Sequence, residues 1–163
     1  MIKDLIEKRE DNIVLIPAYK SYVDFILIAY IHFHYNIDIP FFCSPEDMLH
    51  ISFFSYLIRS GGGFFLNTQH LNSDLFKAVM KAYVSVLFKN NVVMEMFIEK
   101  QRSRSGKIQQ AKQVLFDFTI KNFLNSDSEI SQKKDIKFVP ITINYDRVYE
   151  GETFPLELLG ETK

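Results

Sequence analysis

The sequence has little cysteine, no long hydrophobic segment and almost no net charge. Its 163 residues contain one cysteine, and the formal net charge is −1. A lone Cys43 excludes an internal disulfide framework and fits a reducing compartment, where we expect it to be a small buried hydrophobe. The near balance of charges disfavours general nucleic-acid binding, so any basic surface must be local.

A membrane-spanning helix and a secretion signal are also missing from the sequence. The longest apolar run, which begins at Phe25, is about half of the roughly 20 residues that a spanning helix needs. The first eleven residues are charged and amphipathic and lack the apolar core of a signal peptide. We therefore expect an intracellular chain that does not cross a bilayer, while its 16 Phe and 8 Tyr residues would let it rest on one.

What the sequence does contain is a regular alternation of short apolar runs and amphipathic segments, without internal repeats. The pattern predicts an α/β fold with a central, largely parallel sheet flanked by helices, as one domain over residues 1–163 with its core at about 12–160. Pro140 interrupts the last expected strand and indicates an edge or a bulge there. The expected strands are 12–17, 39–43, 64–66, 92–98 and 136–145, and the expected helices are 1–10, 21–35, 45–60, 72–90 and 109–124, with an exposed loop at 125–134.

Two of these helices have starts and faces that can be assigned from the pattern. Ser21 and Asp24 stand three residues apart before an apolar segment, which is typical of a capping box and explains Asp24 without catalysis. The side chains expected to face the core are Tyr22, Phe25, Ile26, Ala29 and Phe33 in the first long helix, and Leu75, Val79, Tyr83, Val86 and Leu87 in the helix at 72–90.

The most chemically distinctive stretch is the loop that follows the fourth expected strand. Ligands of open α/β sheets bind where strands end, and arginine forks with serine hydroxyls suit phosphate oxygens. A solvated charged loop with surface ion pairs is the alternative. Glu99 is expected to fix one guanidinium group. The loop contains Glu99, Lys100, Arg102, Ser103, Arg104, Ser105, Gly106 and Lys107.

Four loops at strand ends together resemble the four motif blocks of the glycerolipid acyltransferases. In chain order they are P-A-Y-K-S-Y-V-D-F, G-G-F-F-L, E-K-Q-R-S-R-S-G-K and V-P-I-T-I-N-Y-D-R-V-Y-E-G. The resemblance is strongest to glycerol-3-phosphate and dihydroxyacetone-phosphate acyltransferases and leans toward the mitochondrial glycerol-3-phosphate type. Family members continue beyond the point where this chain ends, so a fragment of a longer family member is one interpretation.

The resemblance implies a reaction, its substrates and a location. A block-one histidine, oriented by an aspartate, takes the proton of an acceptor hydroxyl as that oxygen attacks the thioester of acyl-CoA. For Glu99 the resemblance implies an alternative role, to help position the acceptor's hydroxyls. The implied partners are acyl-CoA and glycerol 3-phosphate or dihydroxyacetone phosphate, with peripheral membrane contact. No cofactor or metal is implied beyond acyl-CoA as a substrate. The implied location is the mitochondrial outer membrane or the peroxisome.

The sequence departs from the family pattern at the implied base. Tyr19 stands at the histidine position while Asp24 is kept, and a phenol with an unperturbed pKa of about 10 is a poor base at neutral pH. Asn67 and Thr68 replace the block-two arginines, and Lys100 replaces a block-three glycine. The candidate catalytic residues are thus Asp24 and Tyr19, and the candidate substrate-binding residues are Glu99, Arg102, Ser103, Arg104, Lys107, Lys20 and Gly63.

Two functions from different classes stay open at this point. One is an acyl-CoA-dependent acyltransferase domain. The other is a non-catalytic relative that binds phosphate, coenzyme A, lipid or a partner protein. Of the four histidines, only His70 follows a suitable strand as a replacement base, and we expect His32, His34 and His50 to be core or surface residues.

Overall fold

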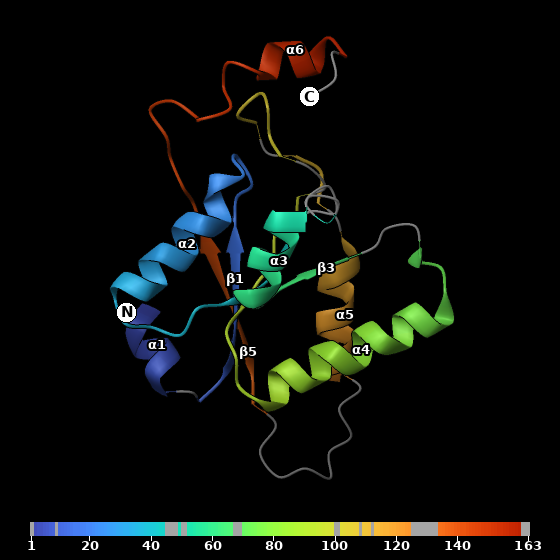
Figure 1. The fold of residues 1–163 in the computed structure, drawn as a ribbon. Coiled ribbons are helices and arrows are strands. Elements are labelled where there is room, and N and C mark those ends of the chain that lie inside the picture. The colour runs from blue at the N-terminus through green and yellow to red at the C-terminus, as the bar shows by residue number, and fades with distance from the viewer. Residues whose placement is uncertain are drawn as a thin grey trace.

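In the computed structural model, the chain forms an α/β domain (Figure 1). The structure describes residues 2–8, 10–44, 49, 52–66, 70–99, 102–107, 109–111, 113–124 and 134–160. In chain order the elements are α1 (Ile2–Lys8), β1 (Asn12–Pro17), α2 (Val23–His34), β2 (Phe41–Ser44), α3 (Ser52–Ser60), β3 (Gly63–Phe65), α4 (Asp74–Lys89), β4 (Met94–Glu95), α5 (Gln113–Leu124), β5 (Ile136–Ile141) and α6 (Phe154–Leu158).

The five strands form one sheet in the order β3-β2-β4-β1-β5, and every pairing in it is parallel. This confirms the predicted fold class. β5 pairs along its whole length with β1 and lies at one edge of the sheet. That edge position explains how Pro140, which has no amide hydrogen to donate, is accommodated in a strand. Because all strands run the same way, their carboxyl ends meet at one side of the sheet.

Helices cover both faces of the sheet. On one face, Val14 and Met94 pack with Met80 and Val84 of α4, and partly buried residues of α5 join this cluster. On the other face, Leu15 and its neighbours pack against α1 and α2. A further cluster of Phe25, Phe42 and Ile58 connects α2, β2 and α3. The sheet is therefore the middle layer, with α1–α3 on one side and α4–α5 on the other (Figure 1).

The predicted inner face of α2 is correct at Phe25 and wrong at Ile26 and Phe33. Ile26 is exposed and Phe33 is 74% exposed, whereas the buried residues of the helix are Asp24, Phe25, Ile28 and His32. Apolar residues surround this helix almost completely, so apolar periodicity does not define its orientation. The two buried polar residues define it, because each has a hydrogen-bond partner inside the protein.

The inner face of α4 is also rotated relative to the prediction. Leu75, Val79 and Val86 are exposed, while Met80, Val84 and Leu87 are buried. The prediction is confirmed only for Leu87 and the partly buried Tyr83. Apolar residues lie on two adjacent faces of this helix, and packing against Val14 and Met94 determines which face is buried.

Most element boundaries differ by a few residues from those predicted, but β4 is limited to Met94–Glu95 where a strand over 92–98 was expected, and α6 was not predicted. α2 begins two residues after Ser21, β5 ends at Ile141 rather than at 145, and α5 begins at Gln113. The predicted start of the helix at 45 and most of the loop at 125–134 lie outside the described residues. Within the described part of the chain, no helix combines the length and apolar character that crossing a membrane requires.

Candidate functional site

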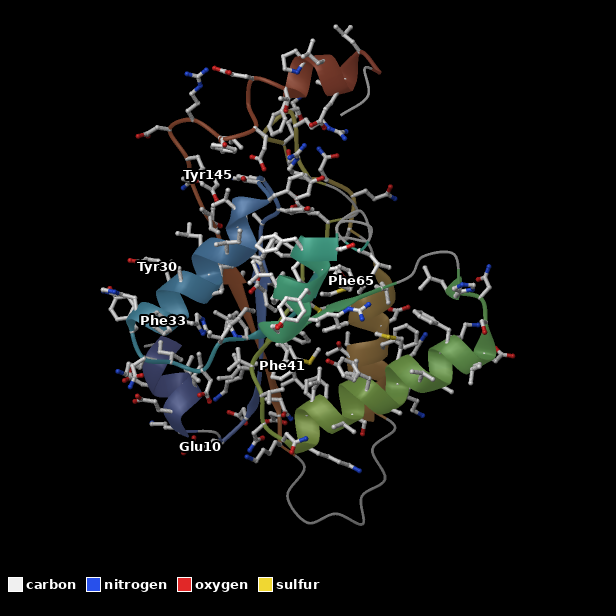
Figure 2. The ribbon with its side chains drawn as sticks, viewed as in Figure 1. Glu10, Tyr30, Phe33, Phe41, Phe65 and Tyr145 are labelled. Carbon is white, nitrogen blue, oxygen red and sulfur yellow. The ribbon has the colours of Figure 1, made fainter. Side chains whose placement is uncertain are left out.

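The predicted site residues other than Gly63 gather at the carboxyl end of β1. The turn that follows β1 (residues 18–22), the loop at 102–107 and the segment after β5 meet there. Figure 2 shows Tyr145 of that last segment beside the start of α2, and its hydroxyl donates a hydrogen bond to Asp24 Oδ1. Parallel strands bring these three regions to the same edge although they are far apart in the sequence.

Asp24 is fully buried, and donors surround its carboxylate. Oδ2 accepts hydrogen bonds from the backbone amides of Lys20 at 2.7 Å and Ser21 at 2.8 Å, and Oδ1 accepts one from the hydroxyl of Tyr145. The contact with the Ser21 amide is the backward reach expected of a capping acid. Burial and the Asp24 carboxylate raise the pKa of the Tyr145 phenol, so Tyr145 is a donor and not a base here.

Tyr19, at which the sequence resemblance implies a histidine, is buried. Its ring is buried against Phe97, with a centroid separation of 4.8 Å, and forms an edge contact with Tyr22 at 6.3 Å. Its backbone amide donates to Glu99 Oε2 at 2.5 Å, and its carbonyl oxygen accepts from the Ser103 amide at 2.9 Å. The loop that begins at Glu99 thus fixes the backbone at position 19.

Glu99 binds backbone amides instead of a guanidinium group. Besides the amide of Tyr19, it accepts a hydrogen bond from the amide of Gln109 at 3.2 Å. The expectation that Glu99 fixes one of the loop arginines is therefore wrong. A carboxylate that joins two separate loops through their amides determines loop geometry directly.

Arg102 is a buried cation whose guanidinium group contacts two aromatic rings and two carboxylates. Its guanidinium carbon lies 4.3 Å from the ring centroid of Tyr22 and 4.8 Å from that of Phe154. One terminal nitrogen is 3.3 Å from Glu150, and the other is 2.8 Å from Glu157. Nε of Arg102 is buried without a hydrogen-bond partner among the described residues. Aromatic faces and carboxylates together compensate the desolvation of this charge.

The remaining predicted binding residues have mixed surroundings. Arg104 donates from Nε to Glu157 at 2.7 Å, and Ser103 donates from Oγ to the carbonyl of Lys107 at 2.5 Å. The ammonium group of Lys20 binds the side chain of Asn144 at 3.1 Å. Lys107 itself is exposed. Ser103 therefore shapes the loop, whereas Lys20 and Lys107 reach toward solvent.

Gly63 has a packing role at the start of β3. A Cβ atom at this position would lie 2.4 Å from Cγ2 of Ile58 and 2.8 Å from the ring of Phe42, closer than real contacts allow. The absence of a side chain thus lets β3 approach α3 and β2.

Glu150 is a site residue that the sequence analysis did not single out. Its carboxylate accepts hydrogen bonds from Ser21 Oγ at 2.7 Å and from the Tyr22 amide at 2.8 Å, and it pairs with Arg102. Burial opposes ionisation, but these hydrogen bonds and the guanidinium charge lower the pKa of Glu150 overall. No short-range pattern signals this role, because the contacts span about 128 positions.

Glu95 is a second residue that sequence reasoning missed. It lies in β4 between Leu15 and Phe42, is 1% exposed, and neither carboxylate oxygen has a hydrogen-bond partner among the described residues. Burial, with a smaller contribution from the negative charge of Asp24, raises its pKa to about 8. An acid inside the apolar run Val92–Ile98 was the available signal.

Several other sequence hypotheses have simpler outcomes. Asn67, Thr68, Lys100 and His50 lie outside the described residues. His32 is buried, with Nδ1 2.8 Å from the carbonyl oxygen of Asp38, whereas His34 and His70 are exposed.

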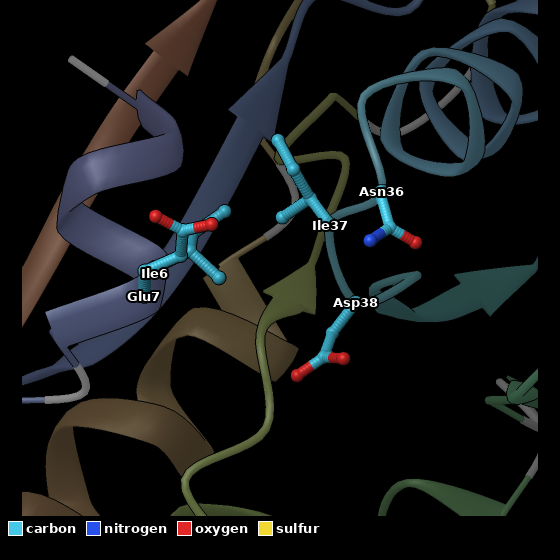
Figure 3. Close-up of a pocket in the computed structure, with 5 residues that line it drawn as sticks. All are labelled: Ile6, Glu7, Asn36, Ile37 and Asp38. Carbon is cyan, nitrogen blue, oxygen red and sulfur yellow. The ribbon is translucent and has the colours of Figure 1, made fainter.

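A pocket in Figure 3 is remote from these residues. It is lined by Ile6 and Glu7 of α1 and by residues 36–38, beyond the C-terminal end of α2, whereas Asp24 is in the first turn of that helix. The described part of the chain contains no cluster of three metal-binding side chains.

Comparison with known proteins defines the class of this domain. A family model described as acyltransferase matches residues 3–144. The chain is 32% identical over 152 residues to a glycerol-3-phosphate acyltransferase of Pseudomonas syringae pv. tomato, covering 93% of this chain and 18% of the relative. It is 31% identical over 156 residues to a dihydroxyacetone phosphate acyltransferase of Bos taurus, covering 95% of this chain and 22% of the relative.

The chain therefore belongs to the acyltransferase family. It spans about a fifth of the length of the relatives that it matches.

Proposed function

We propose that this chain is a glycerolipid acyltransferase domain, built to transfer a fatty acyl group from acyl-CoA to glycerol 3-phosphate or dihydroxyacetone phosphate, in which turnover is very low. The names of the relatives support the acceptors. The observation that carries the low turnover is the buried tyrosine at position 19, packed against Phe97 where a general base would be required.

The chemistry of acyl transfer explains why this substitution matters. The acceptor's hydroxyl oxygen forms a bond to the thioester carbonyl carbon, its proton passes to a base, and the carbon–sulfur bond breaks to release coenzyme A as a thiol. A phenol is largely protonated at neutral pH and cannot take that proton. Loss of a general base typically costs about 10²–10⁴ in rate. Asp24 does not replace it, because three donors already occupy its carboxylate.

One feature of the structure supports acyl-CoA as the acyl donor and contact with a membrane surface. Exposed aromatic and aliphatic side chains gather on α2 and α3, and Figure 2 labels two of them, Tyr30 and Phe33. Apolar helix faces of this kind suit the interfacial layer of a membrane, where acyl-CoA and lipid products partition. The other exposed apolar residues of these helices are Ile26, Ile31, Phe53, Tyr56 and Leu57.

Acyl transfer by the native chain, by Tyr19→His and by Tyr19→Phe tests the proposal. We expect the native chain to be inactive or nearly so, Tyr19→His to gain partial activity, and Tyr19→Phe to behave as the native chain does. The measurement is release of coenzyme A from acyl-CoA in the presence of glycerol 3-phosphate or dihydroxyacetone phosphate. Native turnover of about 1 s⁻¹ or faster, an ordinary enzyme rate, would overturn the assignment of position 19.

A non-catalytic domain that only binds is the second candidate. The observation that favours it is that position 19 holds a buried tyrosine and no base, while the cationic residues Arg102 and Arg104 are present in the loop. Saturable binding of glycerol 3-phosphate or acyl-CoA, with no turnover even in Tyr19→His, would distinguish this candidate from a weakened enzyme.

A further inference from the structure

One segment after β5, residues 144–157, supplies partners for several polar groups of the site. Its contacts reach both the turn after β1 and the loop at 102–107. Asn144 accepts from Lys20, Tyr145 donates to Asp24, Glu150 binds Ser21, Tyr22 and Arg102, and Glu157 binds Arg102 and Arg104.

The two carboxylates of this segment have the surroundings of bound anions. Glu150 lies at the N-terminal end of α2 and accepts from the Tyr22 amide, a serine hydroxyl and a guanidinium group. Glu157 accepts from two guanidinium groups, and the hydroxyl of Thr153 lies 3.4 Å from it. A helix N-terminus with hydroxyls and arginine forks is also how proteins bind phosphate.

We propose that residues 144–157 form an internal cover over the phosphate site, in which Glu157 and Glu150 occupy the positions that the acceptor's phosphate group takes when it binds. This inference rests on the proposed function, because it takes the acceptor to be a phosphomonoester. The phosphate reaches Arg102 and Arg104 only when the Glu157 carboxylate is displaced.

Electrostatics favour competition over joint occupancy. The two guanidinium charges face two carboxylate charges, so the closed cluster has no net charge with which to attract a phosphate dianion. Arg102 is only 5% exposed, and the ring of Phe154 in α6 covers one of its faces. An incoming phosphate must therefore remove a carboxylate from the arginines and uncover Arg102 at the same time.

The cover is attached less firmly than the sheet beneath it. β5 hydrogen-bonds to β1 along six residues, whereas α6 is a single short helix beyond the end of the sheet (Figure 1). Phe154 is its buried residue, while Tyr149, Leu156 and Leu158 are exposed. Segments with few buried apolar contacts open at lower free energy than strands in the core.

The test is titration of the purified chain with glycerol 3-phosphate, with glycerol as the phosphate-free control. We expect Glu157→Gln to bind glycerol 3-phosphate roughly tenfold or more tightly than the native chain, because it removes a charge-assisted competitor. Glu152→Gln is the matched control, since Glu152 is in the same segment and pairs with the exposed Arg147. It should bind like the native chain. Adding Arg104→Gln to Glu157→Gln should remove most of the gain.

A second measurement does not depend on how well the variants fold. In the native chain, saturating glycerol 3-phosphate should accelerate hydrogen exchange at the backbone amides of residues 153–160, while the amides of β1 and β5 stay protected. Saturable binding to the native chain without this acceleration, and without a gain in Glu157→Gln, would overturn the inference and leave the proposed function intact. Absence of binding in every variant would overturn the phosphorylated acceptor and the inference together.

Discussion

The first turn of α2 and the last residue of β4 each bury a carboxyl group on the same side of the sheet, with opposite surroundings. Asp24 in the turn has three hydrogen-bond donors, two of them backbone amides. Glu95 in the strand has none among the described residues. The donors keep a buried carboxylate tolerable in the turn, whereas in the strand burial raises the pKa to about 8 and favours the neutral acid.

Glu95 differs in the same way from Arg102, which lies near the start of α2. Arg102 is also buried, but two carboxylates and two aromatic rings surround it. The carboxyl edge of the sheet is therefore a region of paired charges, whereas β4 contains an acid that has no partner in the described part of the chain. The presence of hydrogen-bond and ion-pair partners, more than the degree of burial, determines which buried side chains can stay charged in this fold.

The largest effect is expected when the cation of the paired region is removed. Arg102→Met leaves Glu150 and Glu157 without their shared partner, and breaking a buried ion pair costs about 3–5 kcal/mol. Urea denaturation at pH 7 measures the free energy of unfolding. Arg147→Met is the control, because this exposed pair with Glu152 contributes only about 0–1 kcal/mol. If charge pairing is the cause, adding Glu150→Gln and Glu157→Gln to Arg102→Met should restore part of the loss.

The next effect has the opposite sign and concerns Glu95. Its folded-state pKa is raised, so the folded protein retains a proton that the unfolded chain has lost between about pH 4.5 and pH 8. The stability that the protonated form of Glu95 allows is fully present below the pKa of Glu95 in the unfolded chain. It is lost as the pH rises through the pKa of Glu95 in the folded protein. Glu95→Gln, which cannot ionise, should therefore raise the free energy of unfolding at pH 7 by about 3 kcal/mol.

The pH dependence distinguishes this cause from a general packing effect. Native and Glu95→Gln proteins should have nearly equal free energies of unfolding at pH 4.5, and the difference should grow toward pH 8. A constant difference at all pH values would show that ionisation of Glu95 is not responsible.

The sequence was sufficient for the parts of this picture that depend on local pattern. The alternation of runs predicted the largely parallel α/β sheet, and Pro140 predicted an edge or a bulge, of which the edge position is the one found for β5. The capping acid at Asp24 was also accessible, because it acts on Ser21 three residues away. These features depend on neighbours in the chain.

The predictions that were wrong, and the residues that were missed, depend on contacts between positions far apart in the sequence. The faces of α2 and α4 could not be assigned because apolar residues lie on more than one side of each helix. The pairing of Arg102 with Glu157 joins residues 55 positions apart, and that of Tyr145 with Asp24 joins residues 121 apart. No spacing rule connects such pairs. Glu95 was hidden for another reason, since a single acid in an apolar run does not alter the strand pattern.

The smallest of the expected effects tests whether the donors around Asp24 account for its tolerance. Tyr145→Phe keeps the ring and removes one of the three donors, the hydroxyl that binds Oδ1. The raised pKa of the Tyr145 phenol means that this donor is present throughout the neutral range. Two backbone donors remain, so the loss should be about 1–3 kcal/mol, the cost of leaving part of a buried group unsatisfied. Urea denaturation at pH 7 measures it, with Tyr149→Phe as the control, because Tyr149 is 87% exposed and should change stability by less than about 0.5 kcal/mol. Equal unfolding midpoints for the two variants would mean that the backbone amides alone support Asp24, and the contrast with Glu95 would then depend on those amides alone.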